Sequence, residues 1–300
     1  DAALNVSSAG TQTLVLDTTA PTVTITDDAS STTNGDITFT MTFDEVVDGF
    51  DATDITVGGG TAGTFTQTGA KVYTLVVTPA ANAAGNVTVD IAGAIATDAA
   101  GNDNTVATQA TQAVDTAAPT PTITTITTPN SDNTPTITVT TDTGSTVKIY
   151  ADGALLGTAT EDGSTGTFTL TPSALPDGSY SITATAADTT GNVSAEATAQ
   201  IVEIDAVQAG VPVISSASLT TDTTPVVSGT AEVGSTITAV IAGATYSVVA
   251  TDGTWSIDTD TASIVSGTLS VNEGDNSVSV TATDAALNVS SAGTQTLVLD

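Results

Sequence analysis

The most regular chemical feature of this 300-residue sequence is a short loop of the form Asp-x-x-x-Asn. It occurs four times, at Asp1 and Asn5, Asp98 and Asn102, Asp188 and Asn192, and Asp284 and Asn288. Carboxylate and amide oxygens are ligands that Ca²⁺ prefers. The same residue types are also common in turns, where their side chains bond to nearby backbone amides. One such loop is therefore consistent with either a metal ligand set or ordinary turn chemistry.

A second acidic landmark divides the chain into blocks of similar length. Asp17, Asp115, Asp205 and Asp300 lie 98, 90 and 95 residues apart, and a proline follows soon after each of the first three. Proline interrupts strand pairing, which is typical of a linker between domains. We therefore predict three domains, at residues 17–114, 115–204 and 205–300.

The seventeen residues DAALNVSSAGTQTLVLD stand both at 1–17 and at 284–300. Identity over this length indicates a segment of a longer array of repeats. The copy at 284–300 contains one of the Asp-x-x-x-Asn loops, followed by a strand-like run. We therefore interpret residues 1–16 as the last strand of a preceding repeat domain.

Runs in which large apolar residues alternate with Thr or Ser predict β-strands along the whole chain. They include residues 22–26, 36–43, 71–77, 136–140, 179–186 and 276–283. A period of two in β-branched residues is typical of half-buried strands, and clusters of Gly, Asn and Asp separate the runs. The pattern predicts an all-β fold of sandwich domains, with no amphipathic helix.

The second and third domains are related to each other. SDNTPTITVTTDTGSTVKIYADG (131–153) aligns without a gap with TDTTPVVSGTAEVGSTITAVIAG (221–243), whereas the first domain has FDEVVDGFDATDITV (43–57) in this region.

These segments, with the DTTAP linker and the DAAGN loop, resemble bacterial immunoglobulin-like (Ig-like) repeats of giant secreted adhesins of the biofilm-associated and RTX types. The resemblance covers essentially the whole chain. It implies tandem seven-stranded Ig-like sandwiches, an extender role, calcium at the domain junctions and type I secretion.

In a sandwich of this kind, the incoming linker, the loop between the second and third strands and the loop between the last two strands lie at one pole. Each brings an oxygen ligand there. The predicted metal ligands are Asp17, Asp44, Glu45, Asp98 and Asn102 in the first domain, Asp115, Asp142, Asp188 and Asn192 in the second, and Asp205, Glu232, Asp284 and Asn288 in the third. Like charges this close repel one another without a cation. We therefore expect Ca²⁺ at each junction between neighbouring repeats.

Composition argues against several other functions. The chain has 33 acidic residues, two lysines and no arginine or histidine, for a formal net charge of −31. Such a surface repels nucleic acid and anionic membranes. Without His or Cys the usual pairs of base and nucleophile are missing, so we predict no enzymatic activity. No apolar run approaches the length of a membrane-spanning helix, so we expect no membrane insertion by this segment.

These observations together predict an extracellular stalk segment on a bacterial cell surface. We expect a monomeric rod that calcium stiffens and that contributes to adhesion and biofilm formation. Two alternatives stay open, namely a ligand-binding module for a glycan or protein surface, and homophilic adhesion through exposed sheet edges. Aromatic residues make up only 3% of the chain, which disfavours a glycan-binding surface.

Overall fold

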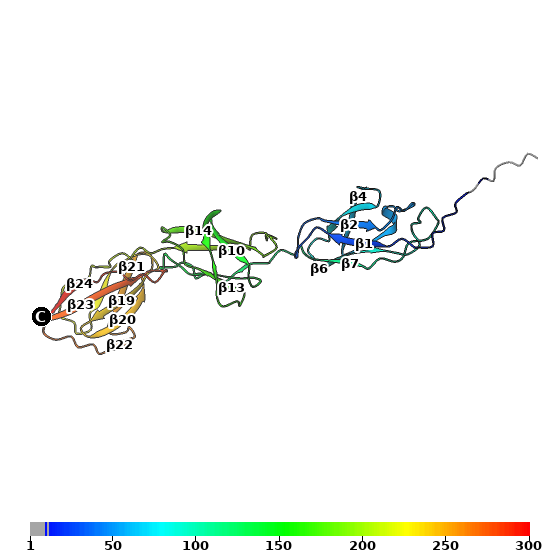
Figure 1. Cartoon of the computed structure of the whole chain (residues 1–300). Coiled ribbons are helices and arrows are strands. Elements are labelled where there is room, and N and C mark those ends of the chain that lie inside the picture. The colour runs from blue at the N-terminus through cyan, green and yellow to red at the C-terminus, as the bar shows by residue number, and fades with distance from the viewer. Residues whose placement is uncertain (1–9, 11) are drawn as a thin grey trace, which may run out of the picture. The chain divides into compact units, whose positions relative to one another are not determined.

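The alternating runs fold into antiparallel strands that enclose three hydrophobic cores (Figure 1). The computed structural model describes residue 10 and residues 12–300. They form two compact units, one that runs to Pro119 and includes Ala187–Val193, and one made of Thr120–Ala186 and Ser194–Asp300. The first core belongs to the first unit, and the second and third cores belong to the second unit. The loop copy at residues 1–5 lies outside the described residues.

The first core is enclosed by a seven-stranded sandwich. Its strands are β1 (Val23–Asp27), β2 (Ile37–Phe43), β3 (Ile55–Gly58), β4 (Gly60–Gln67), β5 (Val72–Pro79), β6 (Ala84–Ile91) and β7 (Ala110–Asp115), with one 3-10 turn, η1 (Ala52–Asp54). One sheet has the order β1-β2-β5-β4 and the other β3-β6-β7. This division of four strands and three is that of a constant-type Ig sandwich.

The second core lies between two four-stranded sheets, of order β12-β13-β9-β8 and β11-β10-β14-β15. Their strands are β8 (Thr122–Ile123), β9 (Ile137–Thr140), β10 (Thr146–Ala151), β11 (Ala154–Thr158), β12 (Thr160–Glu161), β13 (Thr167–Leu170), β14 (Gly178–Ala187) and β15 (Gln200–Ile204). The hairpin β10–β11 turns at Asp152 and Gly153, which both have positive φ.

The third core lies between sheets of order β16-β18-β21 and β17-β24-β23-β19-β20-β22. Their strands are β16 (Val213–Ile214), β17 (Leu219–Thr220), β18 (Val226–Thr230), β19 (Thr236–Ile241), β20 (Ala244–Val249), β21 (Thr254–Asp258), β22 (Ser266–Gly267), β23 (Gly274–Thr283) and β24 (Gly293–Leu299). The hairpin β19–β20 turns at Ala242 and Gly243, again with positive φ. These two residues align with Asp152 and Gly153, in agreement with the ungapped alignment of the two domains.

Period-two burial confirms the all-β prediction. Along β2, side chains alternate between buried and more exposed, and the inward set Ile37, Phe39 and Met41 is fully buried. Phe168 and Trp255, aligned across the second and third domains, are both buried in their cores. Trp255 packs over Gly229, where an added Cβ would lie 2.8 Å from the indole and 1.9 Å from the carbonyl of Val213. Glycine at that position is therefore required.

The repeated segment adopts two structures. Residues 293–299 form β24, which pairs with β23, and Leu297 is only 3% exposed. Residues 12–16 have the same sequence as 295–299 but form no strand, and Leu14, the counterpart of Leu297, is 90% exposed. The strand therefore depends on its partner β23 and not on local sequence alone.

Helix content in the described part of the chain is confined to η1, and nothing helical there has the length and hydrophobicity needed to span a bilayer.

Candidate functional site

The three Asp-x-x-x-Asn loops within the described residues each lie between the last two strands of their domain, as predicted. In the first domain, the loop between β6 and β7 is organised by the buried carboxylate of Asp98. Its Oδ1 accepts hydrogen bonds from the N–H groups of Ala100 and Asn102, both at 2.8 Å, and Oδ2 accepts one from Asn102 Nδ2 at 2.8 Å. The carboxylate thus holds the loop closed around itself.

The same bonds recur in the other two loops. Oδ1 of Asp188 accepts from the N–H of Asn192 at 2.9 Å, and its Oδ2 accepts from Asn192 Nδ2 at 2.7 Å. Asp284 and Asn288 repeat both bonds, at 2.9 and 3.0 Å. The turn chemistry considered for a single loop is therefore present in all three.

A third loop residue was missed by the sequence reasoning. Six positions after each aspartate stands Asn104, Ser194 or Ser290. Its side-chain oxygen accepts a hydrogen bond from the backbone N–H two residues before the aspartate, at 2.9, 2.9 and 2.8 Å respectively. The recurrence of a polar residue at this spacing was the available signal. The motif is therefore Asp-x-x-x-Asn followed two residues later by Ser or Asn.

Each loop is tied to the linker that enters its domain. The Nδ2 groups donate to backbone carbonyls, from Asn102 to Asp17 at 3.3 Å, from Asn192 to Asp115 at 2.9 Å and from Asn288 to Asp205 at 2.7 Å. In this arrangement the asparagine N–H₂ group, and not its oxygen, faces the linker. A ligand role for the three asparagines stays a prediction.

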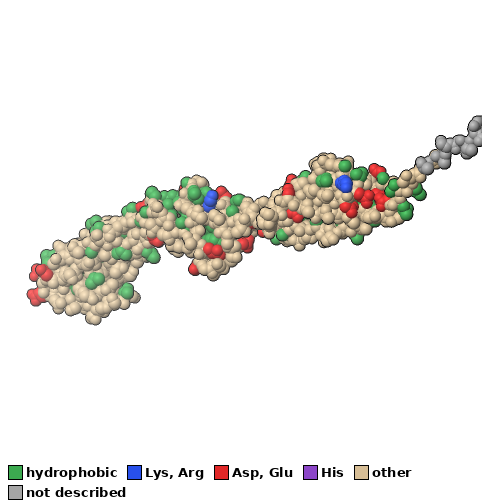
Figure 2. Space-filling model, viewed as in Figure 1, with side chains coloured by type: hydrophobic (Ala, Val, Ile, Leu, Met, Phe, Trp, Pro, Cys, Tyr) green, Lys and Arg blue, Asp and Glu red, His purple; other side chains and the backbone are tan. Residues whose placement is uncertain are grey.

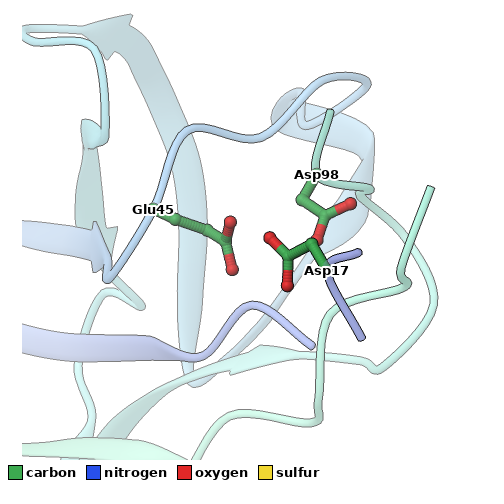
Figure 3. A group of neighbouring side chains, drawn as sticks. All are labelled: Asp17, Glu45 and Asp98. Carbon is green, nitrogen blue, oxygen red and sulfur yellow. The ribbon is translucent and has the colours of Figure 1, made fainter. Parts of the chain in front are cut away.

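Three carboxylates meet at this pole of the first domain (Figure 3). One oxygen each from Asp17, Glu45 and Asp98 lies within 4.8 Å of the other two. Asp17 comes from the linker before β1, Glu45 from the loop between β2 and β3, and Asp98 from the loop between β6 and β7. Figure 2 shows red acidic side chains gathered at this end of the first unit. Three chain segments therefore contribute one carboxylate each, as the sequence predicted for this domain.

The electrostatics of the cluster differ between its members. Partial burial raises the pKa of Glu45, and the charges of Asp98, Asp17 and Asp44 raise it further, against a smaller opposing effect of Lys71. The side chain of Asn102, with backbone N–H groups of the loop, lowers the pKa of Asp98 although burial opposes it. The pKa of Glu45 is therefore raised by burial and by its acidic neighbours, whereas the pKa of Asp98 is lowered because hydrogen-bond donors stabilise its charged form.

Asp44 stands next to Glu45 but has a different partner. Its carboxylate accepts hydrogen bonds from the N–H of Thr22 at 2.8 Å and from Thr22 Oγ1 at 2.7 Å, and these bonds lower its pKa. Lys71 Nζ donates to the backbone carbonyl of Asp44. Asp44 thereby fastens the start of β1 to the loop that presents Glu45, and its role as a ligand stays a prediction.

The predicted sets of the second and third domains are in the expected loops but are less closely gathered. Asp142 lies between β9 and β10, and Glu232 lies between β18 and β19. Among residue 10 and residues 12–300, the one group of three carboxylates close enough to share an ion is that of the first domain. In the other two domains the loop asparagines donate to linker carbonyls, and in the third Gln208 of the linker also donates to the carbonyl of Val289 at 2.8 Å.

Comparison with known protein families gives matches for two stretches of the chain. Residues 17–114 match one family model described as a bacterial Ig-like domain, and residues 123–206 match a second with the same description. No curated protein sequence matches the chain significantly.

Three solved structures illustrate distant likenesses. The chain is similar to fibronectin(III)-like modules of CbhA from Clostridium thermocellum, with 15% identity over 60% of this chain and 94% of that one, at a TM-score of 0.38. It is also similar to the BSP domain of a biofilm-associated protein, with 13% identity over 94% and 66% of the two chains, at a TM-score of 0.28. A membrane-anchored protein from Corynebacterium diphtheriae, described as putative, gives 12% identity over 92% and 89%, again at 0.28. Scores this low say nothing about function.

Proposed function

From the matches of residues 17–114 and 123–206 to bacterial Ig-like domain models, we propose that the chain is a structural spacer segment of a bacterial cell-surface adhesin. Its tandem sandwiches would hold an adhesive part of the parent protein away from the cell and so contribute to adhesion and biofilm formation outside the cell. Ca²⁺ bound at the acidic poles would fix the linkers in place. The absence of His and Cys from the sequence fits a role without catalysis.

The acidic cluster of Asp17, Glu45 and Asp98 is the observation that supports this proposal most strongly. Hard oxygen donors from separate segments suit Ca²⁺, which takes six to eight oxygens and accepts irregular geometry. Hydrogen bonds occupy Oδ1 of Asp17 and both oxygens of Asp98, but each carboxylate oxygen has room for more than one partner. Within the described residues neither oxygen of Glu45 has a recorded hydrogen bond. The donor set therefore fits a cation.

Charge repulsion supplies a mechanism. Without an ion, three carboxylates repel one another and Asp17, which is exposed on the linker, gains by moving away. A bound Ca²⁺ would instead join the linker to the Glu45 and Asp98 loops and hold the chain where it enters β1. Low calcium inside the cell would leave this junction loose during export, and higher calcium outside would close it.

The proposal extends to the second and third domains, where Asp115, Asp142 and Asp188, and Asp205, Glu232 and Asp284, occupy corresponding loops. Fewer carboxylates are gathered there, so we expect weaker binding than in the first domain. A titration that gives one tight and two weaker sites would agree with this order.

Calorimetric titration with CaCl₂ tests the proposal. We expect a dissociation constant on the order of 0.1–1 mM, the range of extracellular calcium modules. At ten times the dissociation constant one ion stabilises the folded form by about 1.4 kcal/mol, so the melting temperature should be higher in calcium than in chelator. Glu45→Gln should weaken the strongest site at least about tenfold, because it removes a whole charge from the cluster.

Asp36→Asn is the matched control. Asp36 is exposed, lies just before the opposite end of β2 from Glu45, and its loss changes the net charge equally. It should bind calcium like the unmodified chain. If both variants weaken binding equally, the effect is general screening and the site is wrong. If calcium neither binds nor raises the melting temperature of the unmodified chain, the calcium proposal fails.

A further inference from the structure

The strand β4 is an unusual sheet edge. It ends the sheet β1-β2-β5-β4 and is eight residues long, whereas the other strands at sheet ends within the described residues have two to six residues. Its sequence, GTAGTFTQ, has no charged residue and no proline, and most of its side chains are small and exposed. Edge strands are normally protected by charges, by proline or by being short. A β-bulge between Ala62 and Phe65 is the one such device here.

The backbone of β4 has groups that point away from the sheet. The N–H of Ala80 donates to the carbonyl of Gly59 at 3.0 Å, and the N–H of Thr68 donates to the carbonyl of Val72 at 2.9 Å. Bonded and non-bonded pairs alternate along an antiparallel ladder. The register therefore directs the backbone groups of Ala62 and Gln67, paired with Val77 and Tyr73, outward.

This edge and the strands next to it in sequence carry no acidic residue of their own, although the charge of Asp48 reaches Tyr73 on β5. Residues 55–89 contain no Asp or Glu over 35 positions, the longest such stretch in the chain, and their one charged residue is Lys71. The stretch contains β3, β4 and β5 and nearly all of β6. Figure 2 shows mainly tan and green side chains over β4, which Figure 1 labels. Two copies of a chain with net charge −31 repel each other over most of their surface, but least here.

We propose that β4 is a self-association edge, at which the β4 strand of a second copy of this chain pairs antiparallel with it. The same neutral edge on both copies allows a two-fold contact, and strand addition to an open edge is an established mode of recognition. Small side chains at Thr61, Ala62 and Gly63 leave room for close backbone approach. The bulge restricts pairing to short regular stretches, so association is weak for one pair of domains and would add up between chains with many repeats.

Charge repulsion predicts a salt dependence that distinguishes pairing through β4 from association of two chains through bridging calcium ions. Salt screens the acidic surfaces, with a Debye length of about 8 Å at 0.15 M. Association through β4 therefore strengthens as NaCl rises and persists in chelator. Association through bridging calcium ions disappears in chelator.

Sedimentation analysis from about 10 µM to about 1 mM protein in chelator, at low and high NaCl, tests the proposal. We expect concentration-dependent association that Ala62→Pro, which removes one outward donor, weakens by about tenfold. Thr64→Asp adds a negative charge on the exposed edge and should weaken it as well. Thr78→Asp adds the same charge on β5, an inner strand of the same sheet, and should have the smaller effect.

Melting temperatures establish that each variant is folded. If Ala62→Pro fails to fold, Thr64→Asp and Thr78→Asp decide the question. A chain that stays monomeric at every concentration and salt in chelator overturns the proposal, and so do two folded edge variants that associate as the unmodified chain does. Either result leaves the calcium proposal intact, because calcium is absent from this experiment.

Discussion

Leu287 occupies a backbone position that glycine occupies in the other two loops. Its φ is +72°, against +89° at Gly101 and +94° at Gly191. A left-handed conformation costs an L-residue roughly 1–2 kcal/mol, because its Cβ crowds the following carbonyl. Leu287 is 75% exposed, so little packing compensates for this cost. The loop of the third domain is therefore strained where its siblings are not.

Leu287→Gly should stabilise the third domain. Relief of the left-handed strain exceeds the greater freedom of glycine in the unfolded chain, so we expect a gain of about 0.5–1 kcal/mol. Calorimetric melting and hydrogen exchange of residues 284–288 measure it.

Gly101→Leu is the reverse control, because a Cβ at Gly101 has no atom within 4 Å and only the backbone conformation opposes it. It should destabilise the first domain by a similar amount. A destabilised Leu287→Gly variant would show that the exposed side chain has a packing role.

At the level of elements, the loop between the last two strands is a hydrogen-bonded clamp. In the first domain its key residue is Asn104, which is buried and uses all four of its bonding positions. It accepts from the N–H groups of Ile95 and Ala96 and donates to the carbonyls of Ala92 and Thr105. Ser194, at the same position in the second domain, accepts a single such bond and is only partly buried.

Asn104→Ala should therefore cost more than Ser194→Ala. The first leaves four backbone groups without their partner, one in a buried bond and three in partly buried bonds, and we expect a loss of about 2–4 kcal/mol. The second removes one bond at a partly exposed site, for about 1 kcal/mol. Melting of both variants in chelator tests the difference, and equal losses would contradict the clamp.

The elements were predictable because their signals are local. Period-two alternation located β2, β5, β14 and β23 to within about two residues. The reason is that the apolar residues of a half-buried strand alternate with polar ones within the strand itself. The edge β4 was not predicted, because its small polar residues do not alternate. The segment GTQTLVL shows the limit of local reasoning, since it forms a strand at 293–299 only beside β23.

The candidate site was only partly predictable for the same reason. Loop membership follows from sequence order, so the placement of Glu45 and Asp98 in their loops was correct. Which side chains then meet depends on hydrogen bonds that spacing does not encode. Thr22 engages Asp44, and the linker carbonyls receive the asparagine N–H groups. The asparagine bond to a linker carbonyl is common to all three domains, whereas the bonds between Thr22 and Asp44 belong to the first domain.

At the scale of the whole molecule, the dominant property is an excess of 31 negative charges. Self-repulsion of this size destabilises a compact state, and protonation or cations relieve it. Hydrogen bonds oppose this effect at particular carboxylates. Burial would raise the pKa of Asp188, but bonds from the side chains of Asn192 and Thr190 and from their N–H groups lower it to about 2.

These opposing shifts predict how stability depends on pH in chelator. The pKa of Glu45 is raised in the folded chain, so its contribution is present below its unfolded pKa and is lost as pH rises through the folded value. The pKa values of Asp98 and Asp188 are lowered, so their contributions are present above an unfolded pKa of about 3.9 and are lost as pH falls through the folded values. We expect the melting temperature to rise from about pH 7 to about pH 5 and to fall below about pH 3.

Calcium should change only the upper part of this profile. A saturating ion neutralises the cluster around Glu45 at pH 7, so acidification to about pH 5 gains less and also displaces the ion by protonation. Glu45→Gln should reduce the acid stabilisation in chelator, because the group that benefits from protonation is gone. Calorimetric melting at each pH, with calcium and with chelator, measures both effects. Two parallel curves would show that repulsion is spread over the whole surface, and that the cluster at Asp17, Glu45 and Asp98 has no special part in it.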